Sequence, residues 1–373
     1  MKRAVCLAVF LFSFVPSAFA QWDLQTSNTT ADLRGIHSIG NGIAWASGTN
    51  GTVLRTEDGG VVWQTCTVPS GAERLDFRGI QAFDANTAIV MSSGKGDLSR
   101  LYKTTDGCHS WKLLFKNPDE DGFWDAMVFD QTKWGWLLGD PVRGSFVLFA
   151  TEDDGRTWTR QHNKGLKAQS SKQGVFAASN SSLLAGPVRF ASGGFDGAYE
   201  YAIVAAEKCI DGCSGQEIDH KGQQATWRKK PIPVGSYTQT SGVFSIASGL
   251  PSDGASGNAP LVAVGGDFRT PDSAAKTAAY SVDGGTTWKA AQKGPHGYRS
   301  SVAYDATTKT WITVGPNGTD ISTDDGKYWR PLDPDPGRHD PPDADRFWNA
   351  ISLPFVVGPR GRIGRLNPAA LHP

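Results

Sequence analysis

The sequence predicts an all-β fold: a seven-bladed β-propeller of four-stranded blades, closed by pairing the N-terminal strand with the last blade. Three observations lead to this prediction. A short motif repeats along the chain, tryptophan residues recur at regular intervals, and the composition suits short strands joined by tight turns. Glycine (44 residues) and tryptophan (13) are abundant, whereas no long stretch has the 3.6-residue apolar period of a helix.

The repeated motif places acidic residues, glycine and tryptophan within eight positions. Its copies are TEDGGVVW (56–63), TTDGCHSW (104–111), TEDDGRTW (151–158), SVDGGTTW (281–288) and STDDGKYW (322–329). The glycines permit positive φ in a tight hairpin, and the aspartate can accept hydrogen bonds from N–H groups of its own turn. One carboxylate per turn cannot surround a metal ion. We therefore interpret these residues as structural: Asp58, Trp63, Asp106, Trp111, Asp153, Trp158, Asp283, Trp288, Asp324 and Trp329.

The spacing of the tryptophan residues indicates the number of blades. Trp22 and Trp227 fit the slot of the motif tryptophans although neither follows a clean motif, which gives intervals of 41, 48, 47, 69, 61 and 41 residues from Trp22 to Trp329. Each tryptophan is expected to begin an outermost strand and to pack between sheets. Similar short sequences mark the first strand of each unit, at 32–36, 76–80, 122–127, 174–177, 242–245, 297–300 and 346–351.

The two ends of the chain complement each other. Residues 347–366 supply three strands with no terminal tryptophan strand, and the Trp22 segment is a terminal strand with no unit of its own. Joining them closes the ring and leaves only short, protected strand edges. Six or eight blades remain the alternative.

Residues 1–20 have the anatomy of a secretory signal peptide, with Lys2 and Arg3, an apolar run and a cleavage site after Ala20. The apolar run is short for a membrane span, and an uncleaved anchor is the alternative. We expect residues 21–373 to form a single propeller domain that is secreted or periplasmic and monomeric, with no integral membrane segment after cleavage. Removal of the leader leaves 35 basic against 37 acidic residues, which argues against nucleic-acid binding through bulk charge.

The motif resembles the Asp-box, or bacterial neuraminidase repeat, of sialidases, sortilin-type domains and other propellers. Together with the Arg-Gly-Ile of the first strands (34–36 and 78–80), the unit resembles the photosystem II stability/assembly factor-like family over nearly the whole mature chain. Insertions in blades four and five, within about 174–291, depart most from that pattern. The resemblance implies a propeller that, in photosynthetic members, helps to assemble a membrane complex.

Four cysteines remain after removal of the leader, and four cysteines allow three pairings. Cys66 and Cys108 both belong near the outer edges of adjacent blades, so we favour a disulfide between them and a second one, between Cys209 and Cys213, in a small local loop. The alternative for the latter pair is a metal site, but no second Cys/His pair accompanies it. We expect neither a metal nor a cofactor.

Aligning the first strands places one residue of each at the channel mouth: Arg34, Arg78, Asp125, Ala177, Ser245, Arg299 and Asn349. The planar guanidinium of arginine suits a carboxylate or a phosphate. We therefore predict a ligand site there; its members are Arg34, Arg78, Asp125, Arg299 and Asn349. The alternative is that these residues pair with one another, Arg78 with Asp125 for example, and only fill the channel.

These features predict an exported, non-enzymatic binding or assembly-factor-like propeller whose partner is another protein or an anionic ligand. The alternative is a sialidase-like or other carbohydrate-active glycoside hydrolase, because sialidases use three arginines and a Tyr–Glu pair such as Tyr199–Glu200. The sialidase signature F-R-I-P is missing, since Gly79 follows Phe77-Arg78. No catalytic residue is assigned.

Overall fold

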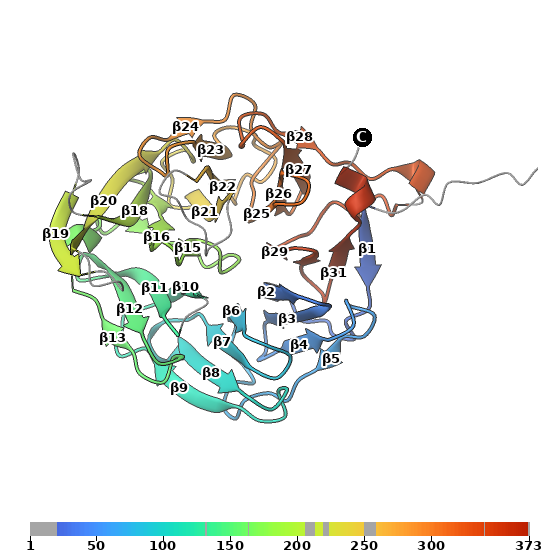
Figure 1. Cartoon of the computed structure of the whole chain (residues 1–373), viewed down its shortest axis with the longest axis horizontal. Coiled ribbons are helices and arrows are strands. Elements are labelled where there is room, and N and C mark those ends of the chain that lie inside the picture. The colour runs from blue at the N-terminus through green and yellow to red at the C-terminus, as the bar shows by residue number, and fades with distance from the viewer. Residues whose placement is uncertain are drawn as a thin grey trace, which may run out of the picture.

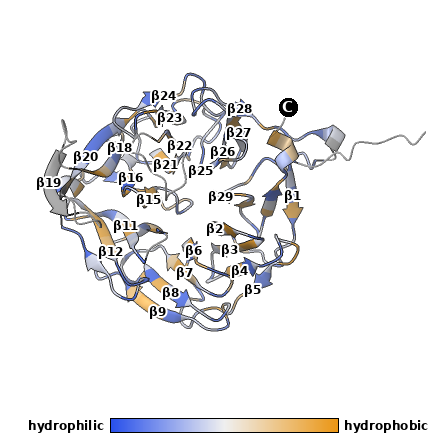
Figure 2. Ribbon diagram, in the orientation of Figure 1, coloured by the Kyte–Doolittle hydropathy of each residue, from blue (hydrophilic) through white to orange (hydrophobic). Residues whose placement is uncertain are grey.

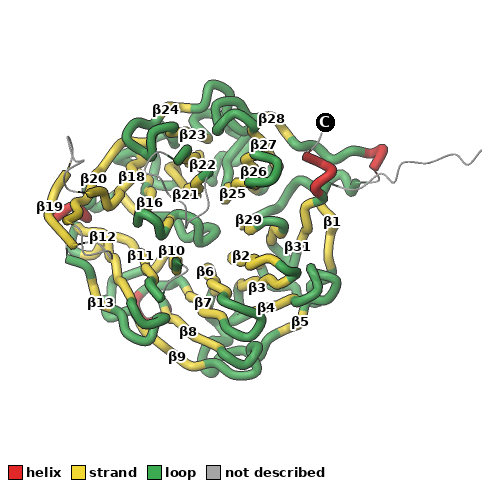
Figure 3. Tube along the Cα trace, viewed as in Figure 1, coloured by secondary structure: helices red, strands yellow, loops and turns green. Residues whose placement is uncertain are grey.

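The computed structural model describes residues 21–130, 133–162, 164–205, 213–218, 224–249, 259–338 and 340–371. The predicted leader and Cys209 lie outside these residues. Loops connect the strands throughout the ring (Figure 3). Helix in the described ranges is limited to short 3-10 turns: η1 (Gly96–Leu98), η2 (Lys164–Leu166), η4 (Pro336–Arg338) and η5 (Pro368–Leu371). The all-β prediction is confirmed.

Seven antiparallel sheets circle a central channel (Figure 1). Four of the blades follow one plan, with strand order running from the channel to the rim. Blade one comprises β2 (Leu33–Gly40), β3 (Ile43–Gly48), β4 (Val53–Thr56) and β5 (Gln64–Thr65). Blade two comprises β6 (Phe77–Ala82), β7 (Ala88–Ser92), β8 (Arg100–Thr104) and β9 (Lys112–Lys116). Blade three comprises β10 (Trp124–Phe129), β11 (Gly135–Val142), β12 (Ser145–Thr151) and β13 (Thr159–Arg160). Blade six comprises β25 (Ser301–Asp305), β26 (Thr310–Gly315), β27 (Gly318–Ser322) and β28 (Arg330–Pro331).

Blade seven joins the two ends of the chain. Its strands are β29 (Ala350–Ser352), β30 (Phe355–Val357), β31 (Ile363–Leu366) and β1 (Trp22–Gln25). β1 runs antiparallel to β31, with Trp22 opposite Leu366 and Gln25 opposite Ile363. The Trp22 ring is fully buried and lies 6.0 Å from the Trp348 ring. The predicted closure of the ring by the N-terminal strand is confirmed.

Blades four and five add strands to the four-stranded plan. Blade four has the order β15 (Leu183–Leu184), β16 (Arg189–Ala191), β18 (Ala198–Ala205), β20 (Gln224–Ile232) and β19 (Cys213–Ile218). Blade five has the order β14 (Gln173–Gly174), β17 (Gly193–Gly194), β21 (Ser241–Ser248), β22 (Leu261–Asp267), β23 (Ala278–Ser281) and β24 (Lys289–Ala290). The prediction that residues 174–177 form the first strand of blade four is wrong, because β14 pairs with β17 in the sheet of blade five.

Hydrophobic packing is divided among the junctions between blades. Hydrophobic residues (orange) lie on strands around the ring (Figure 2). In the described part of the chain, buried hydrophobic residues form seven clusters, one at each contact between neighbouring sheets. At the junction of blades one and seven, for example, the Trp63 ring meets the edge of Phe355 at 5.5 Å. Burial of such rings contributes roughly 1.5–3 kcal/mol each, so every junction helps to stabilise the ring.

The five repeated turns connect the third strand of a blade to the fourth and share one hydrogen-bond pattern. In the first turn the Thr56 hydroxyl donates to Asp58 at 2.8 Å and accepts from the Gly60 N–H at 3.0 Å, while Asp58 accepts from the Val62 N–H at 3.0 Å. Hydrogen bonds from the Ser110 side chain and backbone lower the pKa of the equivalent Asp106 to about 2. The remaining members of this pattern are Asp153, Asp283 and Asp324. These carboxylates hold their own turns.

Residues 175–182, which we call the channel segment, cross the centre of the ring. The loop before β15 reaches into the channel (Figure 1). Its Asn180 side chain accepts from the Met127 N–H at 2.7 Å and donates to the Met127 carbonyl at 2.9 Å. A Cβ atom at Gly79 would lie 2.7 Å from the Asn180 Oδ1 atom. The glycine of the Arg-Gly-Ile sequence in blade two therefore allows Asn180 to approach that blade.

Serine residues of the channel segment extend these contacts to blades five and six. Ser179 donates to the Ser300 carbonyl at 2.8 Å, and the Ser181 hydroxyl donates to the Ser245 hydroxyl at 2.7 Å. The Ile246 N–H donates to the Ser181 carbonyl at 2.9 Å. A single stretch of chain thus hydrogen bonds to the inner parts of blades three, five and six and packs against blade two.

The structure joins Cys66 to Cys108 by a disulfide, across 42 residues and between blades one and two. We predict that reduction of this disulfide lowers the free energy of unfolding by about 2–4 kcal/mol, because the bond restricts the unfolded chain. Urea unfolding with and without reductant measures the change. A Cys66→Ala, Cys108→Ala variant serves as the control and should not respond to reductant. An unchanged midpoint for the reduced wild-type chain would contradict the prediction.

Replacing Asn180 tests the channel segment. Asn180→Ala removes two hydrogen bonds and leaves the buried Met127 N–H and carbonyl unpaired, so we expect a loss of about 2–4 kcal/mol in the free energy of unfolding. Ser179→Ala is the matched control: it removes the hydroxyl contacts with the Ser300 carbonyl and the Ser181 hydroxyl but leaves no backbone N–H unpaired, and it should cost about 1 kcal/mol. If urea unfolding shows that the two substitutions lower the free energy of unfolding equally, the prediction for Asn180 is wrong.

Candidate functional site at the channel mouth

The ring has two distinct faces. In blade one, Leu33 at the start of β2 lies opposite Gly48, so Arg34 is near one end of the sheet. The repeated turn at 56–63 lies at the other end, where the Gly59 N–H donates to the Gly42 carbonyl at 2.9 Å. We call the end that carries Arg34 the mouth face and the opposite end the turn face. The predicted ligand residues and the repeated turns therefore lie on opposite faces of the protein.

Arg34 and Arg78 meet at a shared carboxylate, Asp76. The Arg78 Nε atom donates to Asp76 at 2.8 Å, and its Nη1 atom donates to the Ala177 carbonyl of the channel segment at 3.0 Å. The Arg34 guanidinium lies 3.8 Å from Asp76 and 4.0 Å from Asp32. Both arginine side chains are 30% exposed. This pair combines partial burial with access from solvent.

Arg34 is the less satisfied member of the pair. Its two ion pairs are longer than hydrogen bonds, and within the described ranges the Arg34 side chain makes no hydrogen bond, although its Nε atom is buried. A partly buried guanidinium without hydrogen-bond partners favours an additional acceptor, since a carboxylate can accept two parallel N–H bonds from its planar fork.

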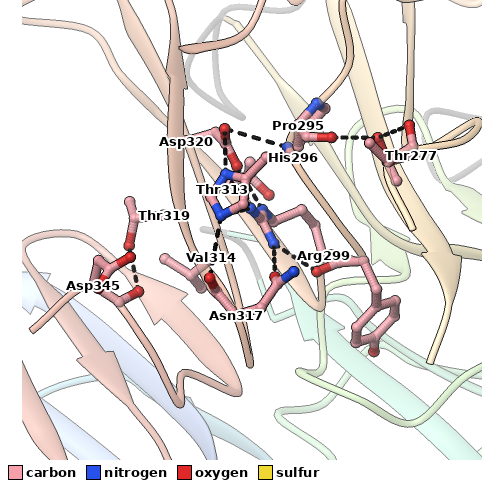
Figure 4. Close-up of polar contacts among 12 residues, drawn as sticks. Thr277, Pro295, His296, Arg299, Thr313, Val314, Asn317, Thr319, Asp320 and Asp345 are labelled. Carbon is pink, nitrogen blue, oxygen red and sulfur yellow. Dashed lines mark hydrogen bonds and ion pairs between the residues drawn. The ribbon is translucent and has the colours of Figure 1, made fainter. Parts of the chain in front are cut away.

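Arg299 lies apart from this pair. Its side chain is fully buried and turns into blade six, where it forms an ion pair with Asp320 and donates to Asn317 at 2.5 Å (Figure 4). The Arg299 Nη1 atom also donates to the Tyr298 carbonyl at 2.8 Å. His296 lies 3.0 Å from Asp320, and this contact raises the pKa of the imidazole. The three arginines aligned in the sequence thus occupy two places, and the guanidinium of Arg299 is surrounded by protein acceptors.

The other predicted members of the ring have different surroundings. The Asn349 side chain donates to the Leu33 carbonyl at 2.8 Å and links blade seven to blade one. Ser245 accepts the Val302 N–H at 3.0 Å and links blade five to blade six. Ala177 belongs to the channel segment, where its carbonyl accepts from Arg78. Of the predicted ligand residues, Arg34, Arg78 and Asp125 remain together near one part of the mouth.

Asp125 is almost completely buried beneath this part of the mouth. Burial, followed by the nearby charge of Asp140, raises the pKa of Asp125 well above its ordinary value, and Arg78 opposes the shift. The predicted alternative pairing of Arg78 with Asp125 is not the one observed, because the hydrogen-bonded partner of Arg78 is Asp76.

Aromatic side chains border the mouth on the side of blades five and six. Phe176 of the channel segment stacks on Phe244 with ring centroids 3.9 Å apart, and Tyr298 meets Phe244 edge-on at 4.7 Å. Phe268 lies 6.1 Å from Phe244 and remains 46% exposed. Sequence comparison of the blades did not indicate this cluster, although the matching Gly-Val-Phe sequences contain two of its members, Phe176 and Phe244.

Glu200, which the sequence offered as part of a Tyr–Glu pair, is fully buried between blades four and five. It forms ion pairs with Arg189 and Arg228, and it accepts from the Trp288 indole N–H at 3.2 Å. Both arginines also donate to the Gly284 carbonyl at 3.2 Å, in the repeated turn of blade five. These contacts make Glu200 a link between two blades.

Two features are absent from the described residues. Their His, Cys, Asp and Glu side chains form no group of three or more that could hold a metal ion. None of their helices has the length and apolar character to span a membrane.

Comparison with known proteins supports the fold and the sequence resemblance. No protein-family model matches the chain. The chain is 26% identical over 308 residues to the "Photosystem II assembly lipoprotein Ycf48" of Picosynechococcus sp. (strain ATCC 27264 / PCC 7002 / PR-6), a match that covers 71% of this chain and 75% of the relative.

Two solved structures share the architecture. "YCF48 bound to D1 peptide" has a TM-score of 0.59 at 15% identity and covers 93% of this chain and 96% of its own. "YCF48 from Cyanidioschyzon merolae" has a TM-score of 0.53 at 17% identity and covers 94% of this chain and all of its own. The chain is thus a seven-bladed propeller that resembles the photosystem II assembly factor Ycf48 in sequence and in fold.

Proposed function

We propose that this chain is an exported, non-enzymatic, assembly-factor-like propeller that holds an anionic segment of a partner protein at its mouth face. The observation that carries the proposal is Arg34. This guanidinium is partly buried, faces a shared carboxylate at 3.8 Å and lacks hydrogen bonds among the described residues. A carboxylate of the partner would accept its N–H groups and those of Arg78.

The neighbouring aromatic residues suit a protein partner. Aromatic and arginine side chains are the residues that most often dominate the binding energy of protein interfaces. The mouth combines both, since Phe268 is exposed beside the buried Phe244 and Tyr298, and Arg34 lies close enough to influence the phenol of Tyr298. An extended segment could therefore place a carboxylate at the arginines and an apolar side chain against the aromatic cluster.

The relatives support the same class of partner. The similar structure bound to D1 peptide shows that this fold can hold a peptide, and the relative from Picosynechococcus is named an assembly lipoprotein. We propose that our chain acts as a monomer in the periplasm or outside the cell, after cleavage of residues 1–20. Its partner is a protein, and the mouth recognises an anionic group of that protein.

The sialidase-like alternative has less support. A sialidase-type site would require three arginines around one carboxylate, whereas Arg299 is buried on Asp320 in blade six. Glu200 is held by two arginines and the Trp288 indole, so it is not placed to attack a substrate. Turnover of any member of a panel of sialosides and polysaccharides by the wild-type chain would revive this alternative.

Affinity capture from the native envelope and secreted fractions tests the proposed function. We expect the wild-type chain to enrich a specific protein, and the Arg34→Ala, Arg78→Ala variant to enrich it about tenfold less, since each charge-assisted hydrogen bond contributes about 1.5–3 kcal/mol. Rising salt should reduce capture by the wild-type chain because exposed charge pairs are screened.

Arg156→Ala is the matched control, because Arg156 is an exposed arginine in a repeated turn on the turn face. It should capture the partner as the wild-type chain does. The proposal is overturned if the arginine pair can be removed without loss of capture, or if removal of Arg156 is equally damaging.

A further inference from the structure

A groove of about 790 Å³ opens on the mouth face beside the channel segment. It lies between the β11–β12 hairpin of blade three and the short strands β14 and β17 of blade five, and Phe176 and Phe195 are among its lining residues. Asp140, at the end of β11, also lines it. Phe176 adjoins Ala177, to which Arg78 donates, so the channel segment links the groove to the proposed arginine site.

Asp140 brings an incompletely satisfied carboxylate to this groove. Its Oδ1 atom accepts from the Val175 N–H at 2.9 Å, and within the described ranges no ion pair joins Asp140 to a cation. A Cβ atom at Gly174 would lie 2.8 Å from that Oδ1 atom, so the glycine permits the close approach. Burial raises the pKa of Asp140 to about 6, and the hydrogen bond from the Val175 N–H opposes this shift.

Asp125, on the neighbouring strand β10, lies close to Asp140. Its side chain is almost fully buried and faces the backbone N–H of Asp140, yet its Oδ2 atom has no hydrogen-bond partner among the described residues. Buried polar atoms are almost always hydrogen bonded in proteins. The neighbouring Arg78 is already engaged by Asp76 and Ala177. A cation held at Asp140 would offset the repulsion between these two neighbouring carboxyl groups.

Among the described residues, the other charged side chains that line the groove form no ion pair with Asp140. Lys172 lies over the Phe195 ring at 5.3 Å, and Asp121 is paired with Lys95 at 2.7 Å. Arg143, at the tip of the β11–β12 hairpin, is exposed. Asp140 and Phe176 both line the groove, and an aromatic ring with a carboxylate is a favourable environment for a cation.

We propose that this groove is a binding site for a cationic side chain, a lysine or arginine of the partner segment, which is recognised by Asp140 with Asp125 behind it. The proposal rests on the proposed function in that the cation belongs to the same partner segment whose carboxylate meets Arg34 and Arg78. The mouth face then recognises a partner segment that carries both a carboxylate and a cationic side chain. The channel segment of the propeller lies between the two recognition sites.

Binding of a small probe tests the site directly. The probe is Nα-acetyl-lysine methylamide, and its neutral counterpart is the norleucine analogue; ligand-observed NMR measures binding of each to the full chain. We expect saturable binding of the lysine probe only, weakened about tenfold by Asp140→Asn. The asparagine keeps an Oδ1 acceptor for the Val175 N–H, so the groove should stay intact. Binding should also weaken as the pH falls below about 6, where Asp140 becomes neutral.

Asp121→Asn is the matched control, since Asp121 lines the same groove but is largely exposed and paired with Lys95. The Arg34→Ala, Arg78→Ala variant should still bind the lysine probe, so this proposal and the proposed function fail separately. The cationic site is overturned if the lysine probe does not bind saturably, if the norleucine analogue binds equally well, or if Asp140→Asn has no more effect than Asp121→Asn.

Discussion

The hydrogen bonds of Asn180 to both backbone groups of Met127 are the contact on which the rest of the structure most depends. In a propeller the inner strands converge on one axis, and their inward backbone groups need partners that are small enough to fit there. The channel segment provides such partners for blades three, five and six. Its sequence from Ala177 to Ser182, AASNSS, contains only small and polar residues, as this crowded position requires.

The same segment builds the candidate site. Its Ala177 carbonyl orients Arg78, its Phe176 ring stacks on Phe244, and its Val175 N–H holds Asp140 at the groove. The channel segment, at the centre of the ring, therefore positions these residues of the mouth face. The turn face has a different chemistry, because each of its repeated aspartates is already bonded within its own turn. Five nearly identical turns therefore coexist with one face that carries the candidate site.

Repetition made the fold predictable from the sequence. The tryptophan spacing located the outermost strand of six blades. For blade four the prediction is wrong, because Trp227 lies within β20 and β19 is added outside it. The unmatched Trp22 segment indicated closure, and the two cysteines near adjacent blade edges indicated their disulfide. These features follow from local sequence patterns, and the same pattern recurs in several blades, so an assignment made in one blade can be compared with the next. Cys213 lies in β19, whereas its proposed partner Cys209 is outside the described residues.

The candidate site was less predictable because alignment gives a position along the chain but not the direction of a side chain. Arg34 and Arg78 lie within first strands, whereas Arg299 precedes β25 and turns back to Asp320. Asp76, the carboxylate that joins the arginine pair, precedes its strand, and its repeat equivalent in blade one is Asp32; the repeat does not reveal that Asp76 contacts both arginines. The channel segment breaks the repeat, since residues 174–177 resemble a first strand, but only Gly174 lies in a strand, β14, which pairs in the sheet of blade five.

Hydrogen exchange measured by mass spectrometry, on the chain alone and with its captured partner, tests the central claim that the mouth face is the functional end. The account predicts that the partner protects amides at the start of β2 and β6 and in residues 173–178, while the repeated turns on the other face exchange as before. Protection confined to the repeated turns, with no change at the mouth, would contradict it.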